Sequence, residues 1–162
     1  QYLLIIFDLN SYLSTYDVFY IDLKYYNTDS GGAQSVYFKF LDVGGSECNL
    51  RYISTGRSQN DSSAVPHAGS GGYFRPTFAN QYATAATYQF YIYNSTLSDT
   101  SLDATITGLS SWYRESAGVS SANFAAQAEA DDKFAKFIIN ADAYSSGSAQ
   151  NARVNARLYG VY

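Results

Sequence analysis

The strongest constraint on the fold is a period-two alternation of apolar and polar side chains, which is clearest in the final stretch, Ala152–Tyr162. One side of this stretch carries Ala152, Val154, Ala156 and Leu158, and the other side carries Arg153, Asn155, Arg157 and Tyr159. This period is that of a β-strand with one buried and one wet face. We therefore expect the chain to end on a strand that closes a sheet.

Similar strand patterns recur along the chain. Tyr2–Leu9 is apolar except for Asp8, as in a strand that is covered on both faces. Further strands are predicted at Val18–Tyr26, Val36–Phe40, Cys48–Ser54, Tyr73–Phe78, Thr87–Asn94, Leu102–Thr107, Leu109–Arg114 and Lys133–Asn140. Phe19, Ile21, Leu23 and Tyr25 share one side of their strand, and Val36, Phe38 and Phe40 repeat the alternation. The residues predicted to point inward are Tyr88, Phe90, Ile92, Leu102, Ala104 and Ile106.

Turn residues punctuate these strands. Asn27–Gly32 is predicted to join the strands on either side of it into a hairpin, and Gly44-Gly45 is predicted to form the next turn. Thr55–Gly72 is the longest predicted loop. Pro76 makes its strand an edge strand. Asn123–Lys133 is rich in Ala, but we interpret it as a strand running into a loop, with a single helical turn as the alternative.

These elements predict an all-β chain: one domain, residues 1–162, with about eight to ten short strands and no helix. Strands of this length suit a jelly-roll-like antiparallel β-sandwich. An immunoglobulin-like sandwich is the alternative, although its Cys…Trp…Cys pattern is absent. No period of about 20–50 residues repeats, so propellers and solenoids are not expected.

Composition limits the partners. The net charge is −4, and the ten basic residues are scattered in the sequence, so we expect no nucleic acid partner. No apolar run reaches the ~18–20 residues that a membrane span needs. Cys48 is the sole cysteine, which excludes an internal disulfide. The chain has no Met, so we expect a processed form or a piece of a longer protein.

No reaction centre is evident. His67, the only histidine, lies in the long predicted loop, and no Gly-x-Ser-x-Gly motif or zinc-type cluster accompanies it. The carboxylates Glu129, Asp131 and Asp132 indicate a solvated acidic turn rather than a glycosidase pair. Asn60-Asp-Ser62 and Asn94-Ser-Thr96 match the glycosylation pattern by chance in an Asn- and Ser-rich chain. We predict a non-enzyme with no cofactor and no metal.

Aromatic side chains are the remaining candidates. The chain has 17 Tyr but only 15% charged residues, which suggests a surface that contacts protein or sugar. Tyr91 and Tyr93 share the outward face of one strand. The other candidate interface or glycan contacts are Tyr25, Tyr26, Trp112 and Tyr113. A covered core face remains an equal alternative for Trp112.

The chain resembles a class of tailed-phage virion proteins that occur as capsid-decorating proteins and as tail-fibre domains. The family's opening hairpin resembles Tyr2–Phe7, Tyr16–Leu23 and the Asp29–Gly32 turn of this chain. The family's central strands resemble Phe90–Asn94 through Ile106. The closing part is Phe137–Ala141, a Ser145-Ser-Gly147 turn and a last strand that ends in Leu158-Tyr-Gly160. Ala149–Ala152 departs from the family, which has Gly beside its small turn residues.

The resemblance implies a non-enzymatic β-sandwich located in the virion. Its expected partners are its own copies, as a homotrimer, and other virion proteins such as the major capsid protein. The first expectation for its function is a capsid cement or decoration protein. The alternative is a tail-fibre or spike domain that binds host surface glycan.

Overall fold

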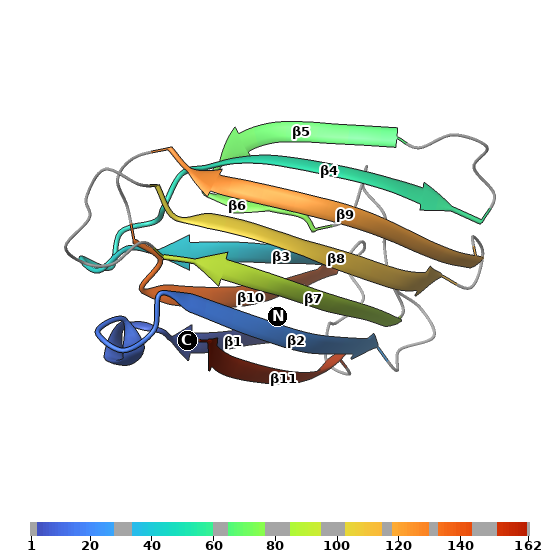
Figure 1. Cartoon of the computed structure of the whole chain (residues 1–162). Helices are drawn as coiled ribbons and strands as arrows, with labels where there is room; N and C mark the ends of the chain where they lie inside the picture. Colours follow the sequence, from blue (N-terminus) through green and yellow to red (C-terminus); the bar gives the residue numbers. More distant parts are fainter. Residues whose placement is uncertain are drawn as a thin grey trace.

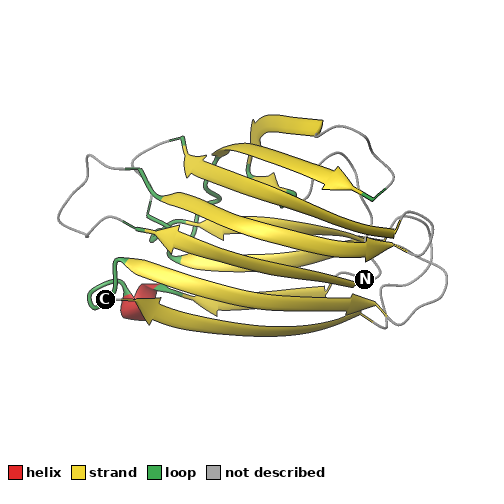
Figure 2. Cartoon of the chain, turned by 45° about the vertical axis from the view of Figure 1, so that its right-hand side comes forward, coloured by secondary structure: helices red, strands yellow, loops and turns green. Residues whose placement is uncertain are grey.

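The computed structural model describes residues 3–27, 34–59, 65–76, 85–94, 103–114, 118–129, 133–143 and 152–161. In this part of the chain, eleven strands form two antiparallel sheets that lie face to face (Figures 1 and 2). The predicted all-β sandwich is confirmed, with eleven strands rather than eight to ten.

The smaller sheet has four strands and the larger one seven. In spatial order, the four-stranded sheet contains β1 (Leu3–Asp8), β10 (Lys136–Ala143), β3 (Gln34–Leu41) and β6 (Tyr73–Phe74). The seven-stranded sheet contains β11 (Ala152–Val161), β2 (Val18–Asn27), β7 (Ala85–Tyr93), β8 (Thr105–Arg114), β9 (Gly118–Ala128), β4 (Leu50–Ser58) and β5 (Val65–Gly71).

The strand pairs are nested in the manner of a jelly roll. β1 pairs with β10, β2 with β7, β3 with β6 and β4 with β5. This nesting arises when one long double strand is wound so that successive strands alternate between two sheets. Three strands extend this framework, because the β8–β9 hairpin is inserted between β7 and β4 and β11 is added beside β2.

The winding overturns the predicted hairpin. β2 and β3 follow each other in the chain, yet they lie in different sheets, so they do not pair with each other as a hairpin. The same holds for β10 and β11 at the end of the chain. β11 has the predicted alternation and forms an edge of the seven-stranded sheet.

The core between the sheets is dense in aromatic rings. Phe38, on β3, lies at its centre and is fully buried. Its ring centroid is 5.0–5.5 Å from those of Phe74, Tyr88, Phe90 and Phe137, and 6.2 Å from that of Phe124. Because these rings come from both sheets, they hold the two layers together.

Other predictions about local structure were wrong. β1 is an edge strand with Ile6 54% exposed, so it is not covered on both faces. The long predicted loop contains the end of β4 and all of β5, whose backbone pairs with β4 although its side chains do not alternate. Cys48 is fully buried and precedes β4. A single 3-10 turn, η1 (Asn10–Tyr12), was not predicted.

The two strands predicted on either side of Gly108 are one strand, β8. A Cβ atom at Gly108 would lie 2.3 Å from the Cβ of Phe90 and 2.7 Å from the ring of Phe124. This glycine therefore makes room for core rings and does not break the strand. In Asn123–Lys133, the strand interpretation is confirmed as far as Ala128, the end of β9.

Candidate functional site

The outer face of the seven-stranded sheet carries the exposed aromatic residues. Tyr91 and Tyr93 lie there as predicted, each 41% exposed. Tyr25 and Trp112 do not, because both point into the core and are only 2% exposed. The predicted surface aromatics are instead their neighbours in sequence, Tyr26 and Tyr113, which a period of two places on the opposite face.

Four tyrosines form a continuous strip on this face, here called the tyrosine ladder: Tyr159, Tyr20, Tyr91 and Tyr93. Tyr20 lies opposite Tyr159 on β11 and opposite Tyr91 on β7. The ring centroids are 5.9 Å apart for Tyr159 and Tyr20, 5.0 Å for Tyr20 and Tyr91, and 6.1 Å for Tyr91 and Tyr93. These separations are within the range of aromatic pairing.

The ladder changes the chemistry of its central ring. The pKa of the Tyr20 hydroxyl is raised above its ordinary value of 10.0, first by desolvation and then by the negative charges of Asp22, Tyr91 and Tyr159 in their ionised forms. Tyr20, like an ordinary tyrosine, is a neutral hydrogen-bond donor and acceptor at physiological pH, and the raised pKa extends this state to more alkaline pH.

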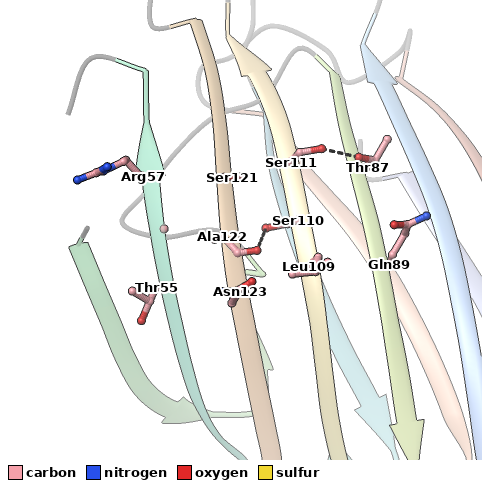
Figure 3. Close-up of a pocket in the computed structure, with 11 residues that line it drawn as sticks. Thr55, Arg57, Thr87, Gln89, Leu109, Ser110, Ser111, Ser121, Ala122 and Asn123 are labelled. Atoms are coloured by element: carbon pink, nitrogen blue, oxygen red, sulfur yellow. Dashed lines mark hydrogen bonds between the residues drawn. The ribbon is translucent and has the colours of Figure 1, made fainter. Parts of the chain in front are cut away.

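A second feature is a line of residues that lie directly opposite one another on five neighbouring strands. We call it the cross-strand row, and its members are Lys24, Thr87, Ser111, Ser121 and Arg57. Its three middle side chains are small hydroxyls, whereas the next row contains the larger Gln89, Leu109 and Asn123. This difference in side-chain size leaves a depression of ≈ 560 Å³, here called the groove, which also reaches Thr55 and Arg57 (Figure 3).

The groove has a firm polar floor. The hydroxyls of Thr87 and Ser111 are hydrogen-bonded at 2.6 Å across β7 and β8 (Figure 3). Beneath them, the buried Ser110 hydroxyl donates a hydrogen bond to the carbonyl oxygen of Pro76 at 2.5 Å. The Thr87 and Ser111 hydroxyls are exposed on the outer face and held by their mutual bond, whereas the Ser110 hydroxyl is buried beneath the sheet.

An aromatic notch adjoins the groove. Ala85 lies directly opposite Tyr26 on one side and Tyr113 on the other, so two exposed rings flank a single methyl group. The depression there measures ≈ 410 Å³ and shares Thr87 and Ser111 with the groove. We call Tyr26, Ala85 and Tyr113 the tyrosine notch. The backbones of its two tyrosines are two strand spacings, or about 10 Å, apart.

Sequence reasoning did not find the groove or the notch. The alternation predicts polar side chains at outward positions of β7 and β8, and Tyr26 and Tyr113 are among the predicted surface aromatics. The alternation does not reveal the register between strands, which places Thr87, Ser111 and Ser121 in one line. Small hydroxyl residues at outward positions of successive strands were the available signal.

Other sequence candidates have structural roles. Asn94 is buried, and its side-chain amide is hydrogen-bonded to both the amide nitrogen (2.9 Å) and the carbonyl oxygen (3.0 Å) of Phe134, so it is not accessible for glycosylation. His67 lies in β5, half-buried, with its ring 5.8 Å from that of Tyr52, and not in a flexible loop. Glu129 contacts Arg51 at 3.3 Å. The other candidates, Asn60, Asp131 and Asp132, lie outside the described residues.

Within the described ranges, no group of three or more His, Cys, Asp or Glu side chains is placed to hold a metal ion. The same part of the chain contains no helix with the length and apolar character of a membrane span. No protein-family model, curated protein or solved structure matches the chain.

Proposed function

We propose that the chain is a non-enzymatic structural protein of a tailed-phage particle that cements or decorates the capsid shell. In this role it is located in the virion, and its partners are its own copies and the major capsid protein. The sequence resemblance to tailed-phage virion proteins in the opening, central and closing parts of the chain supports a location in the phage particle. The fold is compatible with this role, since jelly rolls build many viral capsid domains.

The tyrosine ladder is the observation that carries this proposal. Its rings form one exposed aromatic strip across β11, β2 and β7. Tyrosine is enriched in protein interfaces because it offers a large, amphipathic contact area with few rotatable bonds. In a particle, many copies bind at once, so modest contacts at each ladder add up through multivalency.

The test is binding to capsids. The purified chain is expected to co-sediment with capsids that lack it, and the double variant Tyr20→Ala/Tyr91→Ala is expected to lose this binding. Tyr73→Ala is the matched control, because Tyr73 is 53% exposed on β6 of the four-stranded sheet, whereas the ladder lies on the other sheet. Absence of the protein from purified virions, or equal binding by the double variant, would refute the proposal.

Assembly is measured separately. A homotrimer is expected, since association of copies also covers edge strands such as β11 and β5. Light scattering should then give a mass three times the 17.8 kDa of the chain. A monomer mass at all accessible concentrations would contradict the trimer.

A second candidate function is a tail-fibre or spike domain that binds host surface glycan. The groove and the tyrosine notch favour it, because they combine fixed hydroxyl groups with exposed aromatic rings. Such rings stack on the apolar faces of sugars while hydroxyl and amide groups bond their edges. A glycan array is the measurement, and silence on all host glycans would count against this role.

A further inference from the structure

The charge of the protein is divided unevenly over its surface. The chain as a whole has a net charge of −4 with ten basic residues. Five of those basic residues lie at exposed positions on the outer face of the seven-stranded sheet: Lys24, Arg51, Arg57, Arg153 and Arg157. Along the described strands of this face, Asp22 is the only acidic residue. Half of the basic residues, although scattered in the sequence, therefore lie on one face.

Among the described residues, Asp17 directly precedes β2, and two further carboxylates at the border of this face are engaged. Asp103, just before β8, accepts a hydrogen bond from the side chain of Gln127 at 2.6 Å, and Glu129, just after β9, contacts Arg51. No carboxylate is found among the described residues that line the groove and the notch. The described strands of this face thus carry more basic than acidic side chains on a protein of negative net charge, which favours an anionic partner.

The geometry points to a binding site for an acidic polysaccharide, one that carries carboxylate or sulfate groups, along the cross-strand row. This inference rests on the second candidate function and names its ligand class and its position. Lys24 and Arg57 stand at the two ends of the row, four strand spacings or about 19 Å apart. Between them lie only the hydroxyls of Thr87, Ser111 and Ser121.

The arrangement suits a sugar chain that lies across the strands. The hydroxyl floor and the amides of Gln89 and Asn123 supply donors and acceptors for ring hydroxyls (Figure 3). The cations at the ends supply charge-assisted bonds to acidic groups on separate sugar units. At the β2 end, the tyrosine notch provides two rings between which one sugar unit fits.

A single-stranded nucleic acid fits this row less well. Its backbone places a phosphate at every nucleotide, and proteins match it with closely spaced Lys and Arg side chains. Here, three neutral hydroxyl residues separate the two cations of the row. Oligonucleotide binding is therefore an outcome that the test must distinguish.

The test uses the complete chain and a defined probe. Polygalacturonate oligosaccharides carry one carboxylate per sugar, and their methyl esters keep the same backbone without charge. We expect calorimetry or glycan-coated sensors to detect the acid form and to show binding of the ester at least about tenfold weaker. Raising NaCl to about 1 M, where the Debye length is ~3 Å, should weaken binding of the acid form further.

Variants locate the site. Lys24→Gln and Arg57→Gln should each weaken binding about tenfold, since each removes a charge-assisted bond. Tyr26→Ala should weaken binding of both acid and ester by a similar factor. Lys136→Gln is the matched control, because Lys136 lies on β10 of the other sheet. All of these side chains lie at the surface, and circular dichroism of each variant verifies the fold.

Three results would overturn the inference: equal affinity for acid and ester, no effect of the Lys24 and Arg57 substitutions, or tighter binding of a poly-dT oligonucleotide than of polygalacturonate. The ester comparison uses the unaltered chain, so it remains decisive if a variant fails to fold. Capsid co-sedimentation reports separately on the tyrosine ladder. If the unaltered chain fails to bind capsids but still binds polygalacturonate, the cement role is refuted and this site is left standing.

Discussion

At the scale of single residues, Tyr88 places a hydroxyl group in the core, where the described residues offer it no hydrogen-bond partner. Its side chain is 1% exposed, and its hydroxyl makes no hydrogen bond with any described residue. Burial raises the pKa of this hydroxyl well above its ordinary value of 10.0, and neighbouring Tyr25 raises it further. An unsatisfied buried hydroxyl costs stability that phenylalanine at the same position avoids.

We expect Tyr88→Phe to increase the free energy of unfolding by about 1 kcal/mol, because the ring keeps its contacts and only the hydroxyl is removed. Urea denaturation of wild type and variant measures this. Tyr91→Phe, on the exposed ladder, is the control and should change stability by less than about 0.5 kcal/mol. A marked loss of stability in Tyr88→Phe would show that the hydroxyl has a partner that stabilises the fold.

The same burial sets an alkaline limit on stability. Tyr25 and Tyr88 have pKa values in the folded state that lie above the ordinary 10.0, both because of desolvation. As pH rises through 10.0, the unfolded chain releases these protons while the folded chain retains them. The unfolded state then binds fewer protons, so stability falls with rising pH.

The prediction is a stability plateau below about pH 9.5 and a decline that begins near pH 10. Urea midpoints measured across this interval provide the test. The decline should be shallower in Tyr88→Phe, which removes one of the two groups. A midpoint that stays constant to about pH 11 would contradict the burial of both hydroxyls.

At the scale of the elements, β8 depends on the absence of a side chain at one position. Gly108→Ala would bring a Cβ atom to 2.3 Å from Phe90 and 2.7 Å from Phe124. Overpacking of this kind typically costs about 1–3 kcal/mol. Thermal unfolding should show the loss, whereas Thr107→Ala, on the outer face of the same strand, should change little. A stability equal to wild type in Gly108→Ala would mean that the two rings can move aside.

The strands differ in how well their sequences predict them. β7 and β11 alternate cleanly because one face of each is buried and the other is wet, and their inward residues were predicted correctly. β5 contains Pro66 and two glycines, and it is held by backbone pairing with β4, so its side chains carry no such pattern. Gly108 suggested a break because the reason for a glycine lies in the neighbouring strands.

The site was less accessible to sequence reasoning than the fold. Outward tyrosines follow from the alternation, but a shift of one residue exchanges Tyr25 for Tyr26 and Trp112 for Tyr113. The cross-strand row depends on the register of five strands that are far apart in the chain. Such long-range register is set by packing of the whole sheet and leaves no local mark in the sequence.

At the scale of the whole molecule, Phe38 joins the two sheets. It contacts rings of β6, β7, β9 and β10 at once, so its removal opens a cavity that both layers share. Phe38→Ala should lower the free energy of unfolding by about 3–5 kcal/mol, and Phe38→Leu by less. Far-UV and near-UV circular dichroism should still lose signal in one transition. Separate transitions would show that the sheets unfold independently.

The inserted hairpin has a consequence for how such a protein can diversify. The wound framework consists of the four nested pairs, and neither β8 nor β9 belongs to them. Yet Ser111, Tyr113 and Ser121, from these two strands, shape the middle of the face. Substitutions at the outward positions of β8 and β9 can thus accumulate without disturbing the scaffold, so related proteins can change the surface of this face while they keep the same fold.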